Sequence, residues 1–418
     1  MSPAPQAVIV VGAGIVGVAT ALFLQEDGHR VTLVDPREPG SGTSSGNAGI
    51  ISVASIQPIV TRDTLKKLPT LLTDPLSPLR VRWRHLPTLA PWLARAALAT
   101  REATVERAMI GIQALAARAF RAHEALIQRA GAGDLLRSKG WIKAALDQAA
   151  FERFLEAERP LLDRFAVPYE VLDRGALHDL EPALGSEVTA GLWLTSNREI
   201  THPQAYTERL AALFFERGGR QERHEVKGLA FEAGKVAGVN TAQGAVRGDA
   251  VVIAAGAFSR KLAVEAGHKV PLETERGYHL MLPKSQPSLG RPIYCMNPGF
   301  VLAPMDHGLR LTSGVELASL AAPPDFTWPR RFLPAARRYL PSLDDRVVSE
   351  WQGCRPSLPD SLPVIGRAHR HPNVYLAFGH QHLGLTLGPV TGRIVADLVA
   401  GRDPGLDLGL YAPDRRFY

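Results

Sequence analysis

Cysteine is nearly absent from this chain, and its scarcity excludes several kinds of protein. Only Cys295 and Cys354 occur among 418 residues, and no CxxC pair is present. Two distant thiols provide neither the disulfide framework of a small secreted protein nor a cysteine-based zinc site or redox dithiol. We expect two packed thiols in a reduced, cytoplasmic setting.

Long apolar runs and concentrated positive charge are also lacking. No apolar stretch approaches the roughly 20 residues of a membrane-spanning helix, and the opening MSPAPQ lacks the basic region of a secretory signal. The net charge is +7, but the basic residues are scattered and form no stripe with aromatics, so we expect no nucleic-acid partner. The composition, 45% apolar and 21% charged, is that of a globular protein long enough for two domains.

The most informative segment present is AVIVVGAGIVGVATALFLQEDGHRVTLVD, residues 7–35. A β-branched run leads into GAGIVG, a helical pattern follows, and a second strand ends at Asp35. Gly12 would permit the tight turn, Gly14 the approach of a pyrophosphate, and Gly17 close packing of helix on strand. Asp35 is placed to bind ribose hydroxyls, and the phosphates would lie at the helix N-terminus. The segment predicts a dinucleotide site.

The next segment favours FAD over NAD. PREPGSGTSSGNAGIIS, residues 36–52, is rich in small residues and forms no second helix-and-strand unit. Its backbone could lie close against a flat ligand. Such a long irregular loop fits an extended cofactor that reaches well beyond the first βαβ unit.

Four stretches together resemble the FAD-dependent amino-acid oxidoreductases, the group that contains D-amino-acid dehydrogenases, glycine oxidase and sarcosine oxidase. They are VIVVGAGIVGVATALFL, TSSGNAG, EVKGLAFEAGKVAGVNTAQGAVRGDAVVIAAGAFS, and GCRPSLPDSLPVIG followed by GHQHLGLTLGPVTGR. The chain looks most similar to the D-amino-acid dehydrogenase branch, which includes enzymes for D-proline and cis-4-hydroxy-D-proline. The motifs and the resemblance place FAD contacts at Gly12, Gly14, Ile15, Val16, Gly17, Asp35, Pro36, Ser44, Ser45, Asn47, Ala48, Gly49, Val226, Gly256, Gly384, Leu385 and Thr386.

The expected fold is α/β, and α+β overall. A Rossmann-like FAD-binding domain is expected from residues 1–55, 200–268 and 350–418, interleaved with a substrate domain from 56–199 and 269–349. Apolar alternation predicts a mostly antiparallel sheet with helices in the substrate domain, with strands in 274–283, 294–305 and 309–317. A hairpin is expected within 222–241, turning at Ala233 and Gly234, followed by a buried strand at Val251 to Ala254.

The segment 62–135 is a helical insert with two open interpretations. Its early part mixes Lys66, Lys67, Arg80, Arg82 and other arginines with leucine and tryptophan, and residues 103–130 predict one amphipathic helix. Basic and aromatic residues on short helices suit a membrane interface. A helical pair packed on the substrate domain explains the same pattern. The resemblance adds weight to membrane contact, since members of that branch can pass electrons to a membrane quinone.

Two side chains are candidates for binding a substrate carboxylate. Arg355 lies in WQGCRPSLPDSLPVIG, an irregular proline-punctuated stretch, and its planar guanidinium matches a carboxylate. The corresponding arginine of the family binds the substrate α-carboxylate; a structural salt bridge, for example to Asp360, is the alternative. Strand alternation puts Arg276, Tyr278 and Leu280 on one face, and Tyr278 could reach the substrate if that face lines a pocket. Otherwise Tyr278 is a packing aromatic.

GHQHLGLTLGPVTG, residues 379–392, holds two histidines and the start of a helix expected from about Gly388. No third or fourth ligand lies nearby, so we expect no metal. Instead the backbone at Gly384, Leu385 and Thr386 would face the pyrimidine edge of the flavin, where a helix N-terminus stabilises negative charge. His380 is expected to be structural, and His382 either contacts substrate or is a satisfied loop residue.

The resemblance implies FAD-dependent dehydrogenation of a D-amino acid, with hydride transfer from Cα to flavin N5. The imino acid would hydrolyse to a 2-oxo acid and ammonia, or persist as a cyclic imine if the substrate is a D-proline. Electrons would pass to a quinone or another acceptor. Three alternatives stay open: a glycine- or sarcosine-type oxidase that uses oxygen, a non-catalytic electron-transfer or assembly flavoprotein, and an NAD-dependent dehydrogenase. The expected location is the cytoplasm, with the inner face of the cell membrane as the alternative.

Overall fold

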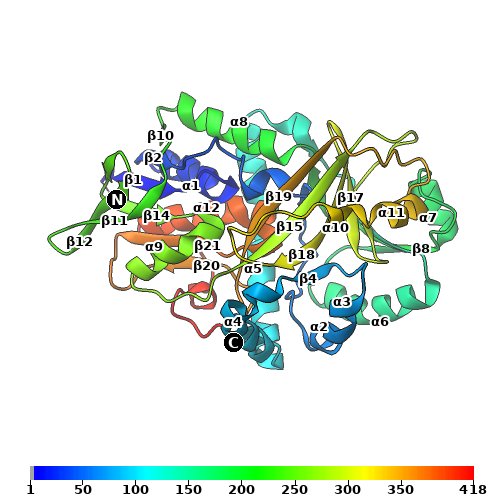
Figure 1. Cartoon of the computed structure of the whole chain (residues 1–418). Coiled ribbons are helices and arrows are strands. Elements are labelled where there is room, and N and C mark those ends of the chain that lie inside the picture. The colour runs from blue at the N-terminus through cyan, green and yellow to red at the C-terminus, as the bar shows by residue number, and fades with distance from the viewer. Residues whose placement is uncertain (1–3) are drawn as a thin grey trace.

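Two sheets of different construction organise the protein (Figure 1). A computed structural model of the chain describes residues 4–418. The first sheet has six strands in which all neighbours are parallel except the last pair. In spatial order its strands are β10 (Arg220–Glu222), β2 (Arg30–Val34), β1 (Ala7–Val11), β14 (Ala250–Ile253), β21 (Val374–Phe378) and β20 (Val364–Arg367).

Helices cover one face of this parallel sheet, and a small antiparallel sheet covers the other. The helices share one buried core with the strands, and are α1 (Ile15–Glu26), α5 (Glu102–Arg129), α8 (Pro203–Glu216) and α12 (Gly384–Val399). The opposite face packs on β11 (Val226–Glu232), β12 (Lys235–Thr241), β13 (Gly244–Arg247) and α9 (Ser259–Glu265). Burial on both faces explains why the central strands β1 and β14 are nearly continuous runs of valine and isoleucine.

The second sheet has nine strands and is mostly antiparallel. Along its main path the strands are β19 (Ser349–Ser357), β15 (Glu273–Leu282), β18 (Gly308–Leu317), β17 (Phe300–Met305), β16 (Ile293–Cys295), β6 (Trp141–Ala145), β8 (Ala190–Leu194) and β7 (Glu170–Leu172), and β4 (Leu79–Val81) pairs with β18. A three-stranded sheet stands apart, made of β3 (Ile50–Ile51), β9 (Arg198–Ile200) and β5 (Leu136–Arg137).

Short helices and turns complete the chain. The helices are α2 (Arg62–Lys66), α3 (Leu68–Thr73), α4 (Leu86–Ala99), α6 (Gln148–Arg164), α7 (Arg174–Leu180), α10 (Thr327–Arg330) and α11 (Leu333–Tyr339). The 3₁₀ turns are η1 (Thr43–Gly46), η2 (Trp83–His85), η3 (Gly133–Leu135), η4 (Gly256–Phe258), η5 (Gln381–Leu383) and η6 (Leu408–Tyr411).

The predicted fold class is confirmed, as are several of its parts. The hairpin turns at Ala233 and Gly234, both with positive φ, and the long helix expected at 103–130 is α5. Two expectations were wrong. The C-terminal helix begins at Gly384 rather than near Gly388, and Arg355 lies on a regular strand, β19, rather than in an irregular loop. That strand pairs with β15, so the chain stays in the antiparallel sheet through Ser357 and returns to the parallel sheet only at β20.

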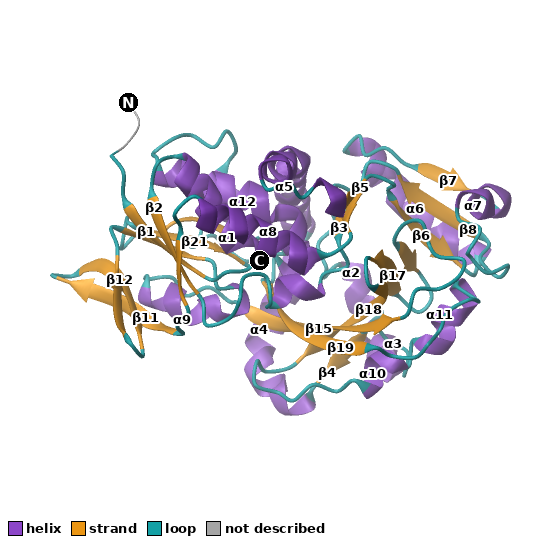
Figure 2. Ribbon diagram, turned by 90° about the horizontal axis from the view of Figure 1, so that it is seen from above, coloured by secondary structure: helices purple, strands orange, loops and turns teal. Residues whose placement is uncertain are grey.

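The insert at 62–135 divides between the two halves of the molecule. Its long helix α5 lies beside α12 and α8, where Ala108, Ile112 and Leu115 join the core of the parallel sheet (Figure 2). Its first part instead packs at the antiparallel sheet, where β4 pairs with β18. No helix within residues 4–418 is both long enough and apolar enough to cross a bilayer.

Candidate functional site

One large cavity runs between the two sheets. Its volume is about 1630 Å³, and its lining extends from Asp35, after β2, and Val226, on β11, to Arg355, on β19, and His382, in η5. Pockets for drug-sized ligands are roughly 300–1,000 Å³. The cavity therefore has room for a large extended cofactor together with a second, smaller molecule.

The glycine motif shapes the end of the cavity at α1. Gly12 has φ +108°, and a Cβ there would stand 2.4 Å from the carbonyl oxygen of Ala254. A Cβ on Gly17 would lie 1.9 Å from the carbonyl oxygen of Gly12, so only glycine lets the helix pack on this turn. A Cβ on Gly14 would meet nothing nearer than the Ser44 hydroxyl oxygen at 3.2 Å. Gly12 and Gly17 thus build the turn, and Gly14 leaves its backbone open to the cavity.

Two polar side chains stand at the N-terminus of α1. The Ser44 hydroxyl oxygen accepts a hydrogen bond from the Ile15 N–H at 3.0 Å. The Asp35 carboxylate accepts from the Ala13 N–H at 2.9 Å and from the Arg37 N–H at 3.0 Å. Free N–H groups and the helix dipole favour an anion at this position. A dinucleotide therefore fits this end, with phosphates at α1 and a ribose beside Asp35.

The loop after β2 is held from behind by Arg310 on β18. This guanidinium is buried, and its Nη1 donates to the carbonyl oxygens of Ser45, at 3.0 Å, and Asn47. Burial without a carboxylate partner lowers the pKa of Arg310 to about 10. On the same side, His279 stacks on Trp351 with ring centroids 5.1 Å apart, and Trp351 leaves no space for a Cβ on Gly46. The loop is thus fixed to the antiparallel sheet.

The N-terminus of α12 reaches the cavity from the opposite side. Buried His123 of α5 donates through Nε2 to the carbonyl oxygen of Leu385 at 3.0 Å, while its Nδ1 accepts from the Tyr206 hydroxyl at 3.0 Å. Burial lowers the pKa of His123 to about 4, which keeps this ring neutral. The Thr386 hydroxyl oxygen accepts from the Ser52 N–H at 3.1 Å. These contacts fix the first turn of α12, which lines the cavity at Gly384, Leu385 and Thr386 and whose N–H groups have no partner within the helix.

Most of the residues predicted to bind cofactor line this cavity: Gly12, Gly14, Ile15, Val16, Asp35, Pro36, Ser44, Asn47, Ala48, Val226, Gly256, Gly384, Leu385 and Thr386. Three of the predicted residues do not line the cavity, so direct contact with the cofactor was the wrong prediction for them. Each has a structural role instead. Gly17 packs on Gly12, Ser45 donates its hydroxyl to the Gly42 carbonyl oxygen at 2.8 Å, and Gly49 lies with φ +82° against the carbonyl oxygen of Ile200.

Arg355 stands in the wall of the cavity with most of its hydrogen-bonding capacity unused. Its Nη1 donates to the Gly314 carbonyl oxygen at 2.9 Å, and it has no ion-pair partner among residues 4–418. The alternative of a bridge to Asp360 is wrong, because Asp360 pairs with Arg415 at 2.7 Å. Desolvation lowers the pKa of Arg355. A half-buried guanidinium with no ion-pair partner is free to bind a carboxylate that a ligand supplies.

The two histidines of the C-terminal motif have different surroundings. His382 is exposed to the cavity near Arg355, and desolvation by the surrounding protein, together with that positive charge, lowers its pKa to about 4. His380 contacts Thr391 through Nε2 and the Thr391 hydroxyl, 2.9 Å apart, and burial lowers its pKa to about 4 as well. Across residues 4–418, no group of three or more His, Cys, Asp or Glu side chains is arranged to hold a metal.

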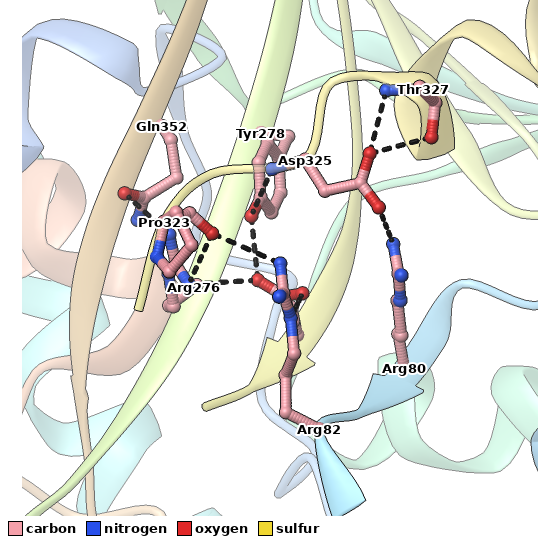
Figure 3. Close-up of polar contacts among 9 residues, drawn as sticks. Arg80, Arg82, Arg276, Tyr278, Pro323, Asp325, Thr327 and Gln352 are labelled. Atoms are coloured by element: carbon pink, nitrogen blue, oxygen red, sulfur yellow. Dashed lines mark hydrogen bonds and ion pairs between the residues drawn. The ribbon is translucent and has the colours of Figure 1, made fainter. Parts of the chain in front are cut away.

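Tyr278 does not face the cavity, so its predicted contact with substrate is wrong. It is fully buried in the core behind the antiparallel sheet, and its hydroxyl donates to Glu316 at 2.6 Å (Figure 3). Arg276 lies on that same rear face and pairs with Glu316 at 3.2 Å. The alternation along β15 was predicted correctly, but it is Glu275, on the opposite face, that lines the cavity.

Sequence reasoning missed several residues of the site. Glu275, Trp351 and Gln381 line the cavity, and Arg310 holds its loop. The outer wall comes from the insert, with apolar side chains from α2, α3 and α4: Leu65, Leu68, Leu71, Leu72, Trp92 and Leu93. A leucine-rich pattern signals burial but not the ligand it surrounds, so only the tertiary structure reveals this wall.

Comparisons of sequence and fold with known proteins support this architecture. A family model described as FAD dependent oxidoreductase matches residues 7–398. The chain is 34% identical over 424 residues to a D-amino-acid oxidase of Bradyrhizobium diazoefficiens, covering 99% of each chain. It is 32% identical over 414 residues to D-amino acid dehydrogenase 2 of Mesorhizobium japonicum, covering 96% of this chain and 98% of the relative. Glycine oxidase from Geobacillus kaustophilus has a similar fold, with TM-score 0.74 at 23% identity and coverage of 98% and 99%.

The family match extends over both sheets and over every segment that lines the cavity. The glycine turn, the acid at the end of β2 and the open N-terminus of α1 are the parts of a dinucleotide site. This chain belongs to the family of FAD-dependent oxidoreductases, and FAD is its cofactor.

Proposed function

We propose that this protein is a D-amino-acid dehydrogenase. The observation that carries the proposal is the unpaired guanidinium of Arg355, which faces a cavity sized for FAD and a small molecule. A relative at 34% identity is a D-amino-acid oxidase and another at 32% is a D-amino acid dehydrogenase, and both align over nearly their whole length. Arg355 binds the substrate α-carboxylate through its two unused donor groups.

The chain contributes positioning and electrostatics to the reaction. When bound, FAD supplies the acceptor for the hydride that leaves Cα. Arg355 fixes the orientation of the substrate, and His382, neutral at pH 7, contacts it from η5. Gly384, Leu385 and Thr386 line the cavity at the start of α12, and their N–H groups would stabilise negative charge on the bound cofactor. The product is an imino acid, which hydrolyses to a 2-oxo acid and ammonia, or persists when it is cyclic.

An apolar acceptor such as a quinone suits the outer wall of the cavity. The wall made by α2, α3 and α4 is lined by leucine, alanine and tryptophan. Nearby, Trp83 is 64% exposed and Leu72 and Leu76 are also exposed, among the basic residues Lys66, Lys67 and Arg84. Exposed apolar and basic groups favour contact with an anionic membrane surface, where a quinone is found.

The decisive test is anaerobic reduction of the bound flavin by a panel of amino acids. The panel contains D- and L-enantiomers, glycine, sarcosine, D-proline and cis-4-hydroxy-D-proline. We expect bleaching by D-amino acids, followed by fast reoxidation with a soluble quinone and slow reoxidation in air. Fast reoxidation in air would indicate an oxidase instead. A flavin that no amino acid reduces would contradict the proposal.

The loop that follows β2 offers a prediction on cofactor affinity. Arg310→Met removes both hydrogen bonds to the loop carbonyls of Ser45 and Asn47 while keeping an apolar stem in the sheet. Each charge-assisted bond contributes about 1.5–3 kcal/mol, so we expect FAD to dissociate at least tenfold more readily. Fluorescence titration of the apoprotein with FAD measures this. Arg338→Met on an exposed surface pair is the control, and equal affinities in the two variants would contradict the role of Arg310.

A further inference from the structure

Glu275 is a buried carboxylate that the proposed function leaves unused. It lines the cavity, and only 3% of its surface is exposed. Its Oε1 accepts a hydrogen bond from the Ser357 hydroxyl at 2.7 Å, and its Oε2 has no partner among residues 4–418. Leaving a buried acceptor unpaired costs free energy, so such a group calls for a ligand or a function.

The position of Glu275 relative to Arg355 indicates which ligand it suits. The two residues are direct partners in the antiparallel ladder between β15 and β19. Side chains of direct cross-strand partners stand on one face with Cβ atoms about 4.5–5.5 Å apart. No ion pair joins them, however, because Arg355 turns toward the Gly314 carbonyl oxygen and Glu275 toward Ser357. A cation and an anion that form no ion pair with each other therefore stand side by side in one wall.

We propose that Glu275 receives the α-ammonium group of the substrate and takes one proton from it. This inference rests on the proposed function, because it presupposes that Arg355 holds the α-carboxylate. In an α-amino acid the two charged groups sit on one carbon, matching the adjacent arginine and glutamate. The proton moves from the substrate nitrogen to the Glu275 carboxylate, and the nitrogen regains the lone pair needed to expel hydride from Cα. The proton leaves to solvent after product release.

The electrostatic surroundings fit this role. Burial raises the pKa of Glu275, while the Ser357 hydroxyl and Arg355 act in the opposite direction. A carboxyl shifted upward is a better proton acceptor for an ammonium than an ordinary one. His382 and His380 also line the cavity, and burial lowers the pKa of each to about 4, so both are neutral at pH 7; the pair of Glu273 with His85, 3.5 Å apart, lies outside the cavity lining.

The pH dependence of Glu275→Gln tests the proposal. At pH 7 we expect kcat/KM to fall about 10²–10³-fold. The variant can oxidise only the fraction of substrate whose amine is already neutral in solution. Its kcat/KM should therefore rise about tenfold per pH unit until the substrate amine is fully deprotonated. The difference in kcat/KM between the variant and the wild type should therefore become smaller as the pH rises. Glu273→Gln, on the same strand but outside the cavity, is the matched control and should leave the profile unchanged. A loss that is equal at every pH, or no loss, would overturn the proposal.

A binding measurement separates this role from a merely structural one. 2-Aminoisobutyrate has no hydrogen on Cα and cannot be oxidised, and isobutyrate is its counterpart without the amine. Changes in flavin absorbance report the binding of both. The wild type should prefer 2-aminoisobutyrate, and Glu275→Gln should lose that preference by at least tenfold while binding isobutyrate no more weakly than the wild type. Equal weakening for both ligands would refute amine recognition.

Ser357→Ala provides a second route if Glu275→Gln fails to fold. Removing the hydroxyl takes away a hydrogen bond to the ionised carboxylate, so the pKa of Glu275 rises. The acid limb of kcat/KM should move upward by about 0.5–1 pH unit. If the acid limb of the kcat/KM profile does not move in Ser357→Ala, that limb does not belong to Glu275.

The outcomes separate this inference from the proposed function. If no amino acid reduces the wild-type flavin, the proposed function itself is wrong. If amino acids reduce the flavin but these pH and binding effects are missing, only the inference about Glu275 is wrong.

Discussion

Arg355→Leu is expected to abolish tight substrate binding while the protein keeps its FAD. Leucine fills much of the same volume but provides no donor for a carboxylate. Removing one partner of a desolvated charge pair costs about 2–5 kcal/mol, so the dissociation constant of the substrate should rise by a factor between about 30 and about 4,000. Arg355 makes no hydrogen bond to the glycine turn, Ser44 or Asp35, the groups at the N-terminus of α1 that would bind the cofactor. Flavin content should therefore be unchanged, and anaerobic titration of the flavin with a D-amino acid measures the loss.

The chemical identity of the bound group can be tested with the same variant. The wild type should prefer an amino acid over its amide, because only the free carboxylate pairs with the guanidinium. Arg355→Leu should bind the two with similar, weak affinity. Arg338→Leu, which breaks an exposed pair, controls for the loss of one positive charge. Undiminished turnover at low substrate concentration in Arg355→Leu would rule out its role in binding.

The sequence predicted the parts of the site that local chain geometry determines. The glycine turn, the acid at the end of β2 and the hairpin at Ala233 depend on neighbouring residues and on backbone conformations that only certain residues adopt. Likewise α5 follows from a long stretch of helical periodicity. Such patterns are visible in a single chain because the interactions that produce them span few residues.

The wall that faces the substrate could not be predicted in the same way. Period-two alternation shows which residues of β15 share a face, but pairing with β18 and β19 decides which face meets the cavity. Tyr278 was consequently assigned to the wrong side, and Glu275 was overlooked. The start of α12 was misplaced for a related reason. Gly388 and Gly392 resemble a helix boundary, yet they let α12 pack on α1, where a Cβ on Gly392 would come within 2.7 Å of the Thr20 nitrogen.

The network behind the cavity leads to the largest expected change in stability. Glu316 is completely buried and holds Arg276, which is also completely buried, at 3.2 Å, and Arg82 at 2.7 Å (Figure 3). Tyr278 donates to the same carboxylate at 2.6 Å. Because Arg82 follows β4, this one carboxylate ties the insert to the antiparallel sheet. Two positive charges depend on it for compensation.

Glu316→Gln should therefore destabilise the protein by about 3–5 kcal/mol, since it leaves the buried Arg276 without a counter-charge. Urea unfolding of the FAD-loaded protein measures the change. Glu187→Gln, on an ion pair more than half exposed on both sides, should cost less than about 1 kcal/mol. Adding Arg276→Met to Glu316→Gln removes the unpaired charge and should recover part of the loss. A single variant as stable as the wild type, or a double variant no better than the single, would mean that charge compensation does not hold this insert in place.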